Sequence, residues 1–520
     1  MRTISTLRFA ALAALALTVA CEDPPRPVRS PRPPPAPAPA PPAPPSPDAW
    51  RAQMPAPGAA PQLVLPRFEK ATLANGLTVI VVTRHELPVV SVGLAFGAGS
   101  SSDPRDQAGT ADLAYQMLAE GAGGKDALAL DTAFSDLGAG LTIGTRPDGA
   151  LASTRVLRRN LEPALALLAD VVLKPTFAAK DFERRKKQTL SDLARRAGEP
   201  RFLAQQAFVA SAFGPEHPYG HLVVGSTASV ERLTLAQVKS FYQVHTGPRA
   251  SAIIFAGDVT LEQATALAQK QFGAWKGDAA LPPPPPTPPT PERAQVVVVP
   301  KAGLQQTIVL VGRPGVASGN PDEAKLDLAT AVFGGFFGSR LNMNLREAKG
   351  YTYGARSDSD ARLGVGPLSV ISPVRADVTG PALQEVFGEL KGMKGRPITT
   401  RELEEAREGL VRAFPGSFET VEGLAASAAG LFFGRRPLDE YEAQVKALQG
   451  ASAAQVQAVA ESFFEPGRMQ VVLVGDPDLI RAQTSALGLG PLVMRAPEGP
   501  TDKPKAPAGP ADKPKPPATR

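Results

Sequence analysis

The sequence contains few of the residues that most often carry catalysis. Among 520 residues it has one cysteine and four histidines. The single cysteine, Cys21, excludes a disulfide bond within the chain. His217 and His221 are four residues apart, but Pro218 and Gly220 lie between them and argue against a helix that would aim both rings at one metal ion. We expect this pair to shape a turn, and the other two histidines stand alone.

The N-terminus lacks a run long enough to cross a bilayer. Arg2 and Arg8 are followed by an apolar run from Phe9 to Ala20, which is too short for a stable transmembrane helix but suits the core of a signal peptide. The run leads directly into Cys21, and this arrangement resembles a bacterial lipoprotein signal; ordinary secretory cleavage is the alternative. We predict a signal peptide over residues 1–20, lipidation of Cys21 and a lipid-anchored location in the bacterial cell envelope, facing the periplasm.

A strong charge of one sign is missing from the central part of the chain. The formal net charge is +6, but much of the excess lies at the two ends. Residues 1–50 hold five arginines against three acidic residues, and residues 496–520 hold five basic against three acidic residues. The sequence has no basic stripe interleaved with aromatic residues, so nucleic acid is not an expected partner.

Proline, in contrast, is abundant, and many of the 55 prolines lie in three tracts. Such tracts favour extended polyproline segments and are expected to bury no apolar surface. We predict a Pro-rich spacer over residues 21–66, a Pro-rich linker over residues 279–292 and a disordered Pro/Lys-rich tail over residues 491–520. Two segments remain as folded domains, residues 67–278 and residues 293–490.

The two folded segments share features that indicate a duplicated unit. Each opens with β-rich sequence, LANGLTVIVV in the first and AQVVVVP with TIVLVGRPG in the second, and then becomes helical, as in the apolar spacing of Leu161–Leu173. Each closes on a hydrophobic strand followed by Gly-Asp, and these aspartates, Asp258 and Asp476, lie 218 residues apart. A second matching pair, Phe182 and Leu403, lies 221 residues apart. We therefore predict an α+β fold of two homologous α/β-sandwich lobes, each a sheet with helices.

Four stretches, in order along the chain, identify a family. They are ANGLTVIVV, GAGSSSDPRDQAG, HPYGHLVVGS and GGFFGSRLNMNLREAKGYTYG. Together they resemble the pitrilysin/insulinase family of metallopeptidases, the inverzincins, over nearly all of residues 67–490. The resemblance implies that the two lobes face each other as a clamshell and hold a peptide between them as an added strand.

The resemblance also shows what this chain has lost. Active members carry His-x-x-Glu-His on a helix, where two histidines bind zinc and the glutamate activates a metal-bound water. Aligning GTADLAYQML with that helix places Asp112 at the first histidine, Tyr115 at the glutamate and Gln116 at the second histidine. The third ligand of the family, a glutamate about 76 residues further on, corresponds to Asp192. We therefore expect no zinc in this chain.

Two interpretations of these four positions remain. The oxygens of Asp112, Gln116 and Asp192 could hold a hard cation such as calcium or magnesium, which would allow weak hydrolysis with an unconventional metal. The favoured alternative is that they are polar residues on a helix that faces an open cleft. Tyr115 is a poor general base in either case, since the ordinary pKa of tyrosine is near 10.

The second half retains another element of the family. Arg346 and Tyr353 have the spacing of an arginine and a tyrosine that, in family members, project into the cleft and hold the substrate or its transition state. An arginine offers a planar fork of donors, and a tyrosine hydroxyl can donate to a developing oxyanion. The alternative is that Arg346 pairs on the surface with Glu347 or another acid, and that Tyr353 is a core aromatic residue. The nearby glycines Gly334, Gly335 and Gly338 lack a phosphate-loop ending, so we expect them to allow close packing.

These features lead to two functional hypotheses. Several members of this family are heterodimers in which one subunit binds zinc and the other supplies the arginine and the tyrosine. We predict that this chain is the non-catalytic subunit of such a peptidase, with an HxxEH-containing partner that carries the zinc and with unfolded peptides as ligands. The alternative is a lipid-anchored pseudoenzyme that serves as a peptide-binding or structural scaffold.

Overall fold

The structure is a computed structural model that describes Arg51, residues 63–490 and residues 492–496. The chain divides after Gln62 into two units, and only the second, from Leu63 onward, is described below. The predicted signal peptide and lipidation site, with most of the predicted spacer and tail, lie outside the described residues. In the described part, no helix has the length and hydrophobicity that a membrane span requires.

The first half contains a six-stranded sheet in the order β1-β2-β8-β3-β7-β6. Only β2 and β8 run parallel, and the other neighbours are antiparallel. β1 and β2 form a hairpin around Asn75-Gly76, where Gly76 has a φ of 92°, as the Asn-Gly pair predicts. The strands are β1 (Glu69–Thr72), β2 (Thr78–Thr83), β3 (Val89–Phe96), β6 (Thr142–Arg146), β7 (Gly149–Leu157) and β8 (Ser251–Gly257). Two short strands, β4 (Gly121–Ala122) and β5 (Lys125–Asp126), form a separate hairpin.

The second half repeats this topology. Its sheet has the order β11-β12-β10-β13-β9-β14, and β13 and β9 form the parallel pair that corresponds to β8 and β2. The strands are β9 (Gln295–Pro300), β10 (Gln306–Pro314), β11 (Arg356–Ser359), β12 (Pro367–Arg375), β13 (Gln470–Gly475) and β14 (Leu492–Met494). The predicted α+β fold of two homologous lobes is thus confirmed.

The two sheets differ at one edge, and here a sequence prediction was wrong. The edge strand β1 is antiparallel to its neighbour, whereas β14 pairs with β9 in parallel. β14 lies inside residues 491–520, which were predicted to be a disordered tail. Its backbone pairs with the outer edge of β9, and Leu492 packs against the core of the second half. The unpaired N–H and C=O groups at a sheet edge can pair with a further strand, and the short apolar segment Leu492–Met494 does so here.

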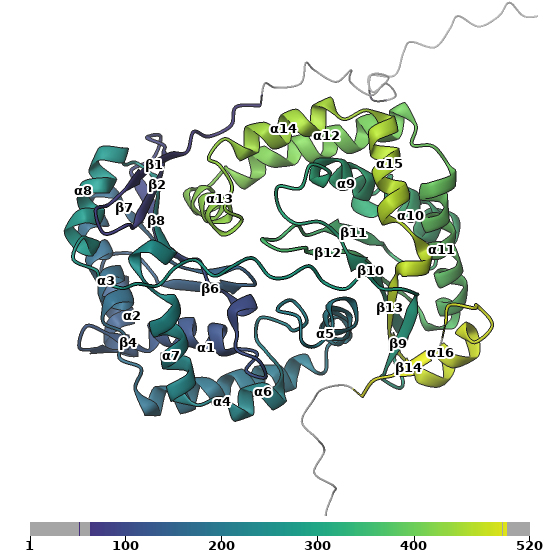
Figure 1. Cartoon of the computed structure of the whole chain (residues 1–520), viewed down its shortest axis with the longest axis horizontal. Coiled ribbons are helices and arrows are strands. Elements are labelled where there is room, and N and C mark those ends of the chain that lie inside the picture. Colours follow the sequence, from purple (N-terminus) through teal and green to yellow (C-terminus); the bar gives the residue numbers. More distant parts are fainter. Residues whose placement is uncertain (1–50, 52–62, 491, 497–520) are drawn as a thin grey trace, which may run out of the picture. The chain divides into compact units, whose positions relative to one another are not determined.

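Helices cover each sheet (Figure 1). The predicted helix over Leu161–Leu173 is α3. The first half contains α1 (Thr110–Gln116), α2 (Ala127–Ser135), α3 (Leu161–Leu173), α4 (Ala179–Arg196), α5 (Pro200–Phe213), α6 (Thr227–Arg232), α7 (Leu235–His245) and α8 (Leu261–Phe272). The second half contains α9 (Glu323–Thr330), α10 (Arg340–Asn342), α11 (Thr379–Gly395), α12 (Thr400–Ser417), α13 (Val421–Phe433), α14 (Glu440–Gly450), α15 (Ala453–Phe463) and α16 (Pro477–Thr484). Ala331–Gly335 and Met343–Ala348 are π-helical segments.

The halves exchange one helix each. One face of each sheet packs against helices of its own half. The other face of the first sheet packs against α13, which belongs to the second half, through residues such as Ile254 and Leu424. The other face of the second sheet packs against α5, which belongs to the first half, through residues such as Leu310 and Phe208. Neither sheet could bury both faces without the other half, so the two halves form one cooperative structure.

The Pro-rich linker over residues 279–292 contacts the rest of the protein between Leu281 and Pro286, contrary to the expectation that it would bury no apolar surface. Leu281 packs over Gly97, where a Cβ atom would lie 2.1 Å from the leucine side chain. The carbonyl of Pro286 lies 2.8 Å from Nε2 of His217, and that of Pro282 accepts from Arg435. Polyproline segments make no internal hydrogen bonds, which leaves these carbonyls free to accept from side chains. His217 also accepts from its own turn, at Nδ1, as expected for a residue that shapes a turn.

A buried polar cluster joins the same turn to the second half. The Tyr219 hydroxyl donates to Oδ1 of Asp148 at 2.5 Å and accepts from the backbone N–H of Gly364 at 3.0 Å. The other carboxylate oxygen of Asp148 accepts from the N–H of Leu363 at 2.9 Å. Burial raises the pKa of Asp148, while the hydrogen bond from Tyr219 lowers it. The cluster therefore fixes the loop between β11 and β12 against the first half.

We expect Tyr219→Phe to lower the free energy of unfolding by about 1–2 kcal/mol, because it leaves the buried N–H of Gly364 without its acceptor and removes the shorter hydrogen bond to Oδ1 of Asp148, which keeps only that from Ser101 at 3.4 Å. Chemical denaturation followed by fluorescence measures this loss. Tyr351→Phe is the control, since Tyr351 is only half-buried and its hydroxyl makes no hydrogen bond within the described residues. Equal effects of the two substitutions would contradict the role given to the cluster.

Candidate functional site

Three of the four zinc-site positions meet in one open cavity. Asp112 and Gln116 lie one turn apart on α1, and Asp192 reaches the same space from α4. The cavity has a volume of about 500 Å³. Its other lining residues are Arg185, Gln188, Thr189, Arg196, Phe202, Gln205, Leu222, Val223 and Val224. All of these residues belong to the first half, so neither Arg346 nor Tyr353 is part of this cavity.

The chemistry of this cavity does not fit zinc. The three positions of the zinc ligands carry two carboxylates and an amide. This set offers a metal ion neither an imidazole nitrogen nor a sulfur ligand. Two guanidinium groups, Arg185 and Arg196, lie near Asp112, and they oppose the rise in its pKa that burial causes. Cations so placed repel a metal ion. Across the described residues, no group of three or more His, Cys, Asp or Glu side chains has an arrangement that could hold a metal.

Arg185 is held in place by a buried carboxylate. Its Nε donates to Oε1 of Glu120 at 2.6 Å, and Arg184 pairs with the other oxygen of Glu120. Glu120 has a side chain only 3% exposed, and a buried carboxylate of this kind is stable only when paired. Glu120 follows Gln116 by one turn of the chain, so the same segment supplies both the cavity wall and the anchor for its arginine.

Tyr115, the residue at the general-base position, does not face the cavity. Its side chain is fully buried, and its hydroxyl donates to the carbonyl of Ala98 at 2.8 Å. The ring stacks on Phe96 at 4.9 Å and contacts Phe241 and Tyr242 edge-on. Burial raises the pKa of Tyr115 far above its ordinary value. It is a core residue and cannot act as a base.

The start of α1 is positioned by Asp103, which was not among the predicted site residues. Asp103 is half-buried, and its two carboxylate oxygens accept from the N–H groups of Gly109 and Ala111, both at 2.7 Å. Gly109 has a φ of 96°, a conformation that favours glycine. Burial raises the pKa of Asp103 and these two hydrogen bonds lower it. The Asp-Pro turn in the sequence was the available signal for such a cap.

Arg346 and Tyr353 lie in the second half, on the segment that the family resemblance indicates. Arg346 is part of the π-helix Met343–Ala348, and its guanidinium lies 4.6 Å from the centre of the Phe337 ring. It also pairs with Glu347 at 3.2 Å, as the surface alternative anticipated. The other part of that alternative was wrong, because Tyr353 is 88% exposed and not in the core. Both side chains are therefore accessible to a second molecule.

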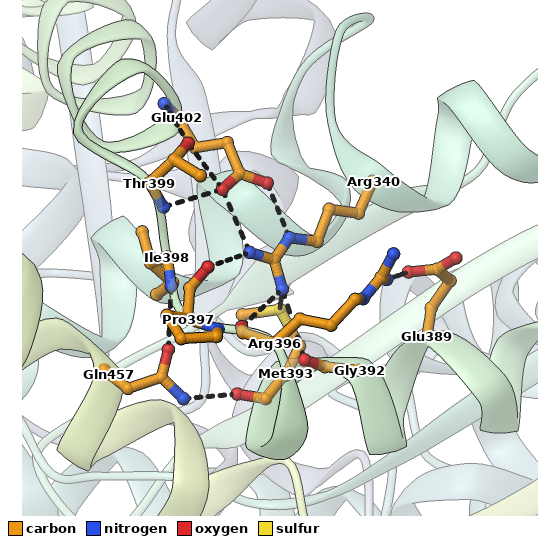
Figure 2. Close-up of polar contacts among 10 residues, drawn as sticks. All are labelled: Arg340, Glu389, Gly392, Met393, Arg396, Pro397, Ile398, Thr399, Glu402 and Gln457. Carbon is orange, nitrogen blue, oxygen red and sulfur yellow. Dashed lines mark hydrogen bonds and ion pairs between the residues drawn. The ribbon is translucent and has the colours of Figure 1, made fainter.

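Buried polar contacts fix the segment that carries them (Figure 2). The Arg340 side chain, 9% exposed, donates from Nε and Nη2 to the two oxygens of Glu402, at 2.6 and 3.0 Å. It also donates to the carbonyls of Arg396 and Pro397, so it joins α10 to the turn between α11 and α12. Arg340 was not among the residues predicted from the sequence, where only its place between small and apolar residues in GSRLN could have indicated burial.

Two asparagines complete the support. Asn342 donates to the carbonyls of Phe336 and Ala355 and accepts from the N–H of Ala355. It thus ties the loop that holds Phe337 to the chain just after Tyr353. Asn344 donates to Glu385 and Glu389 of α11. The buried face of the segment is therefore fixed to the protein, while Arg346 stands on its accessible face.

Close packing explains part of the glycine cluster Gly334, Gly335 and Gly338. A Cβ atom on Gly334 would lie 2.9 Å from Oγ of Ser357 on β11, so the predicted close packing holds there. Gly338 has no neighbour within 4 Å of such an atom. The absence of a contact at Gly338 shows that packing alone does not explain all three glycines.

We expect Arg340→Met to cost about 2 kcal/mol at neutral pH, because it takes the guanidinium partner from Glu402, whose side chain is half-buried. Burial acts to raise the pKa of Glu402, but hydrogen bonds from Arg340 and Thr399 outweigh it and lower the pKa from 4.5 to about 2. A lowered carboxyl pKa means that the pair stabilises the protein fully above pH 4.5, and that this stabilisation is lost as the pH falls toward 2. The difference in stability between wild type and variant should shrink over that range.

Urea denaturation between pH 3 and 7 tests this pair. Arg401→Met is a matched control on the adjacent helix, since the Arg401 side chain is 86% exposed and its pair with Glu405 lies in solvent. We expect no measurable change from that substitution. A pH-independent loss in Arg340→Met would show that the arginine acts by packing and not by its charge.

Comparison with known proteins agrees with this arrangement. The family model described as "Insulinase (Peptidase family M16)" matches residues 78–222, and the model described as "Peptidase M16 inactive domain" matches residues 232–410. A crystal structure of a peptidase M16 inactive domain from Pseudomonas fluorescens is 30% identical, with a TM-score of 0.73 over 79% of this chain and 98% of that one. This chain belongs to the M16 (insulinase) peptidase family. It is a member without the HxxEH zinc motif, as the sequence predicts.

Other relatives show how wide the similarity is. An uncharacterized zinc protease of Mycobacterium leprae is 29% identical over 66% of this chain and 77% of its own length. A protease from Helicobacter pylori has the same fold, with a TM-score of 0.74 over 79% of this chain and all of that one, at 21% identity. The description zinc protease applies to the relative. The M16 chain described here has Asp112, Gln116 and Asp192 at the positions of the zinc ligands.

Proposed function

We propose that this M16 chain is the non-catalytic subunit of a two-chain zinc peptidase of the bacterial cell envelope. It would bind unfolded peptides and place Arg346 and Tyr353 at the zinc site of an HxxEH-containing partner of the same family. The observation that carries the proposal is a contrast within the chain. Its own metal positions cannot hold zinc, yet Arg346 and Tyr353 are accessible on a segment that buried polar contacts hold in place.

The two groups suit that task chemically. A guanidinium offers several donors to a peptide carbonyl, and a phenol can donate to the oxyanion that forms when water attacks it. Donors already fixed before the reaction need no reorganisation, which is why such positioning accelerates it. Their distance from the Asp112 cavity is no obstacle if the reacting zinc belongs to another chain.

The test is an affinity pull-down of the tagged chain from the membranes of its own cells, with the eluate assayed on unfolded peptides with and without a zinc chelator. Chelator-sensitive cleavage together with a co-eluting HxxEH chain supports the proposal. An inactive eluate without such a chain refutes it and favours the other hypothesis, a lipid-anchored pseudoenzyme that acts as a scaffold. Mass spectrometry of the mature N-terminus in the same sample tests the lipid on Cys21.

A further inference from the structure

The cavity at the former zinc position keeps unused hydrogen-bonding groups at its mouth. Gln188 on α4, Gln205 on α5 and Arg196 at the end of α4 line it and are exposed. Within the described residues, neither amide has a hydrogen-bond partner, and the Arg196 guanidinium makes no ion pair within 4 Å. Its neighbour is the ring of Phe202, whose centre lies 5.9 Å away. These donors and acceptors are free to meet a ligand.

The other charges of the cavity are already compensated nearby. Arg185 pairs with Glu120, and Asp192 pairs with Arg195 at 3.5 Å. Asp112 is half-buried, and its charge is offset by Arg185 and Arg196, both of which act to lower its pKa. Arg196 at the mouth is thus the charged group of this cavity with the most unused donors, and its planar fork matches a carboxylate.

The other lining residues of the cavity have side chains suited to binding a peptide. Glutamine side chains present the same amide group as the peptide main chain, with one acceptor and two donors. Part of the wall is apolar, formed by Leu222, Val223 and Val224. A ligand that suits the cavity therefore has a carboxylate, main-chain amides and apolar side chains within a few residues of one another.

We propose that this cavity binds the C-terminal end of a peptide, with the free carboxylate on Arg196, the main chain on Gln188 and Gln205, and a side chain against Leu222–Val224. The proposal rests on the proposed function only in taking a peptide as the ligand. The cavity lacks the zinc ligands that hydrolysis in this family requires, but it is still large enough for a peptide end. A peptide end bound there is therefore held without being cleaved.

The experiment uses the full chain without a partner. A fluorescently labelled unstructured octapeptide ending in leucine is titrated in two forms, with a free C-terminal carboxylate and with a C-terminal amide. We expect the free acid to bind about tenfold to a hundredfold more tightly, as a charge-assisted hydrogen bond implies. Arg196→Gln should reduce the affinity for the free acid to that for the amide, and Gln188→Leu should weaken both forms.

Arg201→Gln is the matched control. It lies on α5 beside Phe202, is also exposed, and does not line the cavity. Equal affinities for acid and amide, equal effects of Arg201→Gln and Arg196→Gln, no binding of either form, or complete displacement by acetate would each overturn the proposal. Because neither a partner nor Arg346 enters this experiment, its failure leaves the two-chain peptidase standing, and failure to find a partner leaves its result intact.

Discussion

Replacing Tyr115 by glutamate, the residue that active family members have at this position, is expected to destabilise the protein by about 4 kcal/mol or more. The substitution removes a ring that packs on Phe96, Phe241 and Tyr242 and the hydrogen bond to Ala98. It also places a carboxyl group where no cation is available to pair with it. Either the group stays charged and unpaired or its pKa rises until it is neutral, and both outcomes cost stability.

Thermal and chemical denaturation of Tyr115→Glu measure this loss. Tyr115→Phe is the matched control, because it keeps the ring and removes only the hydrogen bond to Ala98; we expect it to cost about 1–3 kcal/mol. A Tyr115→Glu variant as stable as Tyr115→Phe would mean that the new side chain can leave the core and reach the cavity. That result would reopen the question of whether the zinc site can be restored by substitution at the ligand positions alone.

Local sequence patterns predicted much of the fold because they depend on neighbouring residues. The hairpin at Asn75-Gly76 follows from turn chemistry, and the helix over Leu161–Leu173 follows from apolar spacing. The duplication was also predictable, from the matching ends at Asp258 and Asp476.

The helix exchange was not predictable in this way. The apolar residues of α5 indicate that the helix is buried on more than one side. Periodicity predicts which face of a helix is buried, but it does not predict which part of the protein covers that face. The same holds for the linker, whose binding depends on His217 and Arg435 far away in the sequence. Composition predicts an extended conformation for such a segment and says nothing about what it contacts.

The candidate site was predictable in part for the same reason. The family spacing brought Asp112, Gln116 and Asp192 together, and the structure places them in one cavity. The family spacing could not show that the Tyr115 side chain points into the core, because a tyrosine at that position of the helix can point into the core or into the cavity. Nor could it indicate Arg340, whose carboxylate partner Glu402 lies 62 residues further along the chain.

Arg346→Ala is expected to reduce the activity of the proposed two-chain peptidase about 100-fold, with the effect mainly on kcat, because removal of one oxyanion donor costs about two to three orders of magnitude. The side chain is accessible and its main contacts are Phe337 and Glu347, so its loss should leave the fold and the assembly unchanged. Tyr353→Phe should retain more activity, since it removes a single hydroxyl from an exposed ring.

Steady-state kinetics of the reconstituted pair on an unfolded peptide measure these effects, with size-exclusion chromatography as the check on assembly. Arg356→Ala is the control, because Arg356 is an exposed arginine of the same half whose nearest carboxylate, Asp358, lies 4.0 Å away. A fully active Arg346→Ala pair would remove this residue from the reaction. A pair that fails to assemble would instead give Arg346 a place in the contact between subunits, because an accessible arginine stacked on an exposed phenylalanine is also a composition typical of protein interfaces.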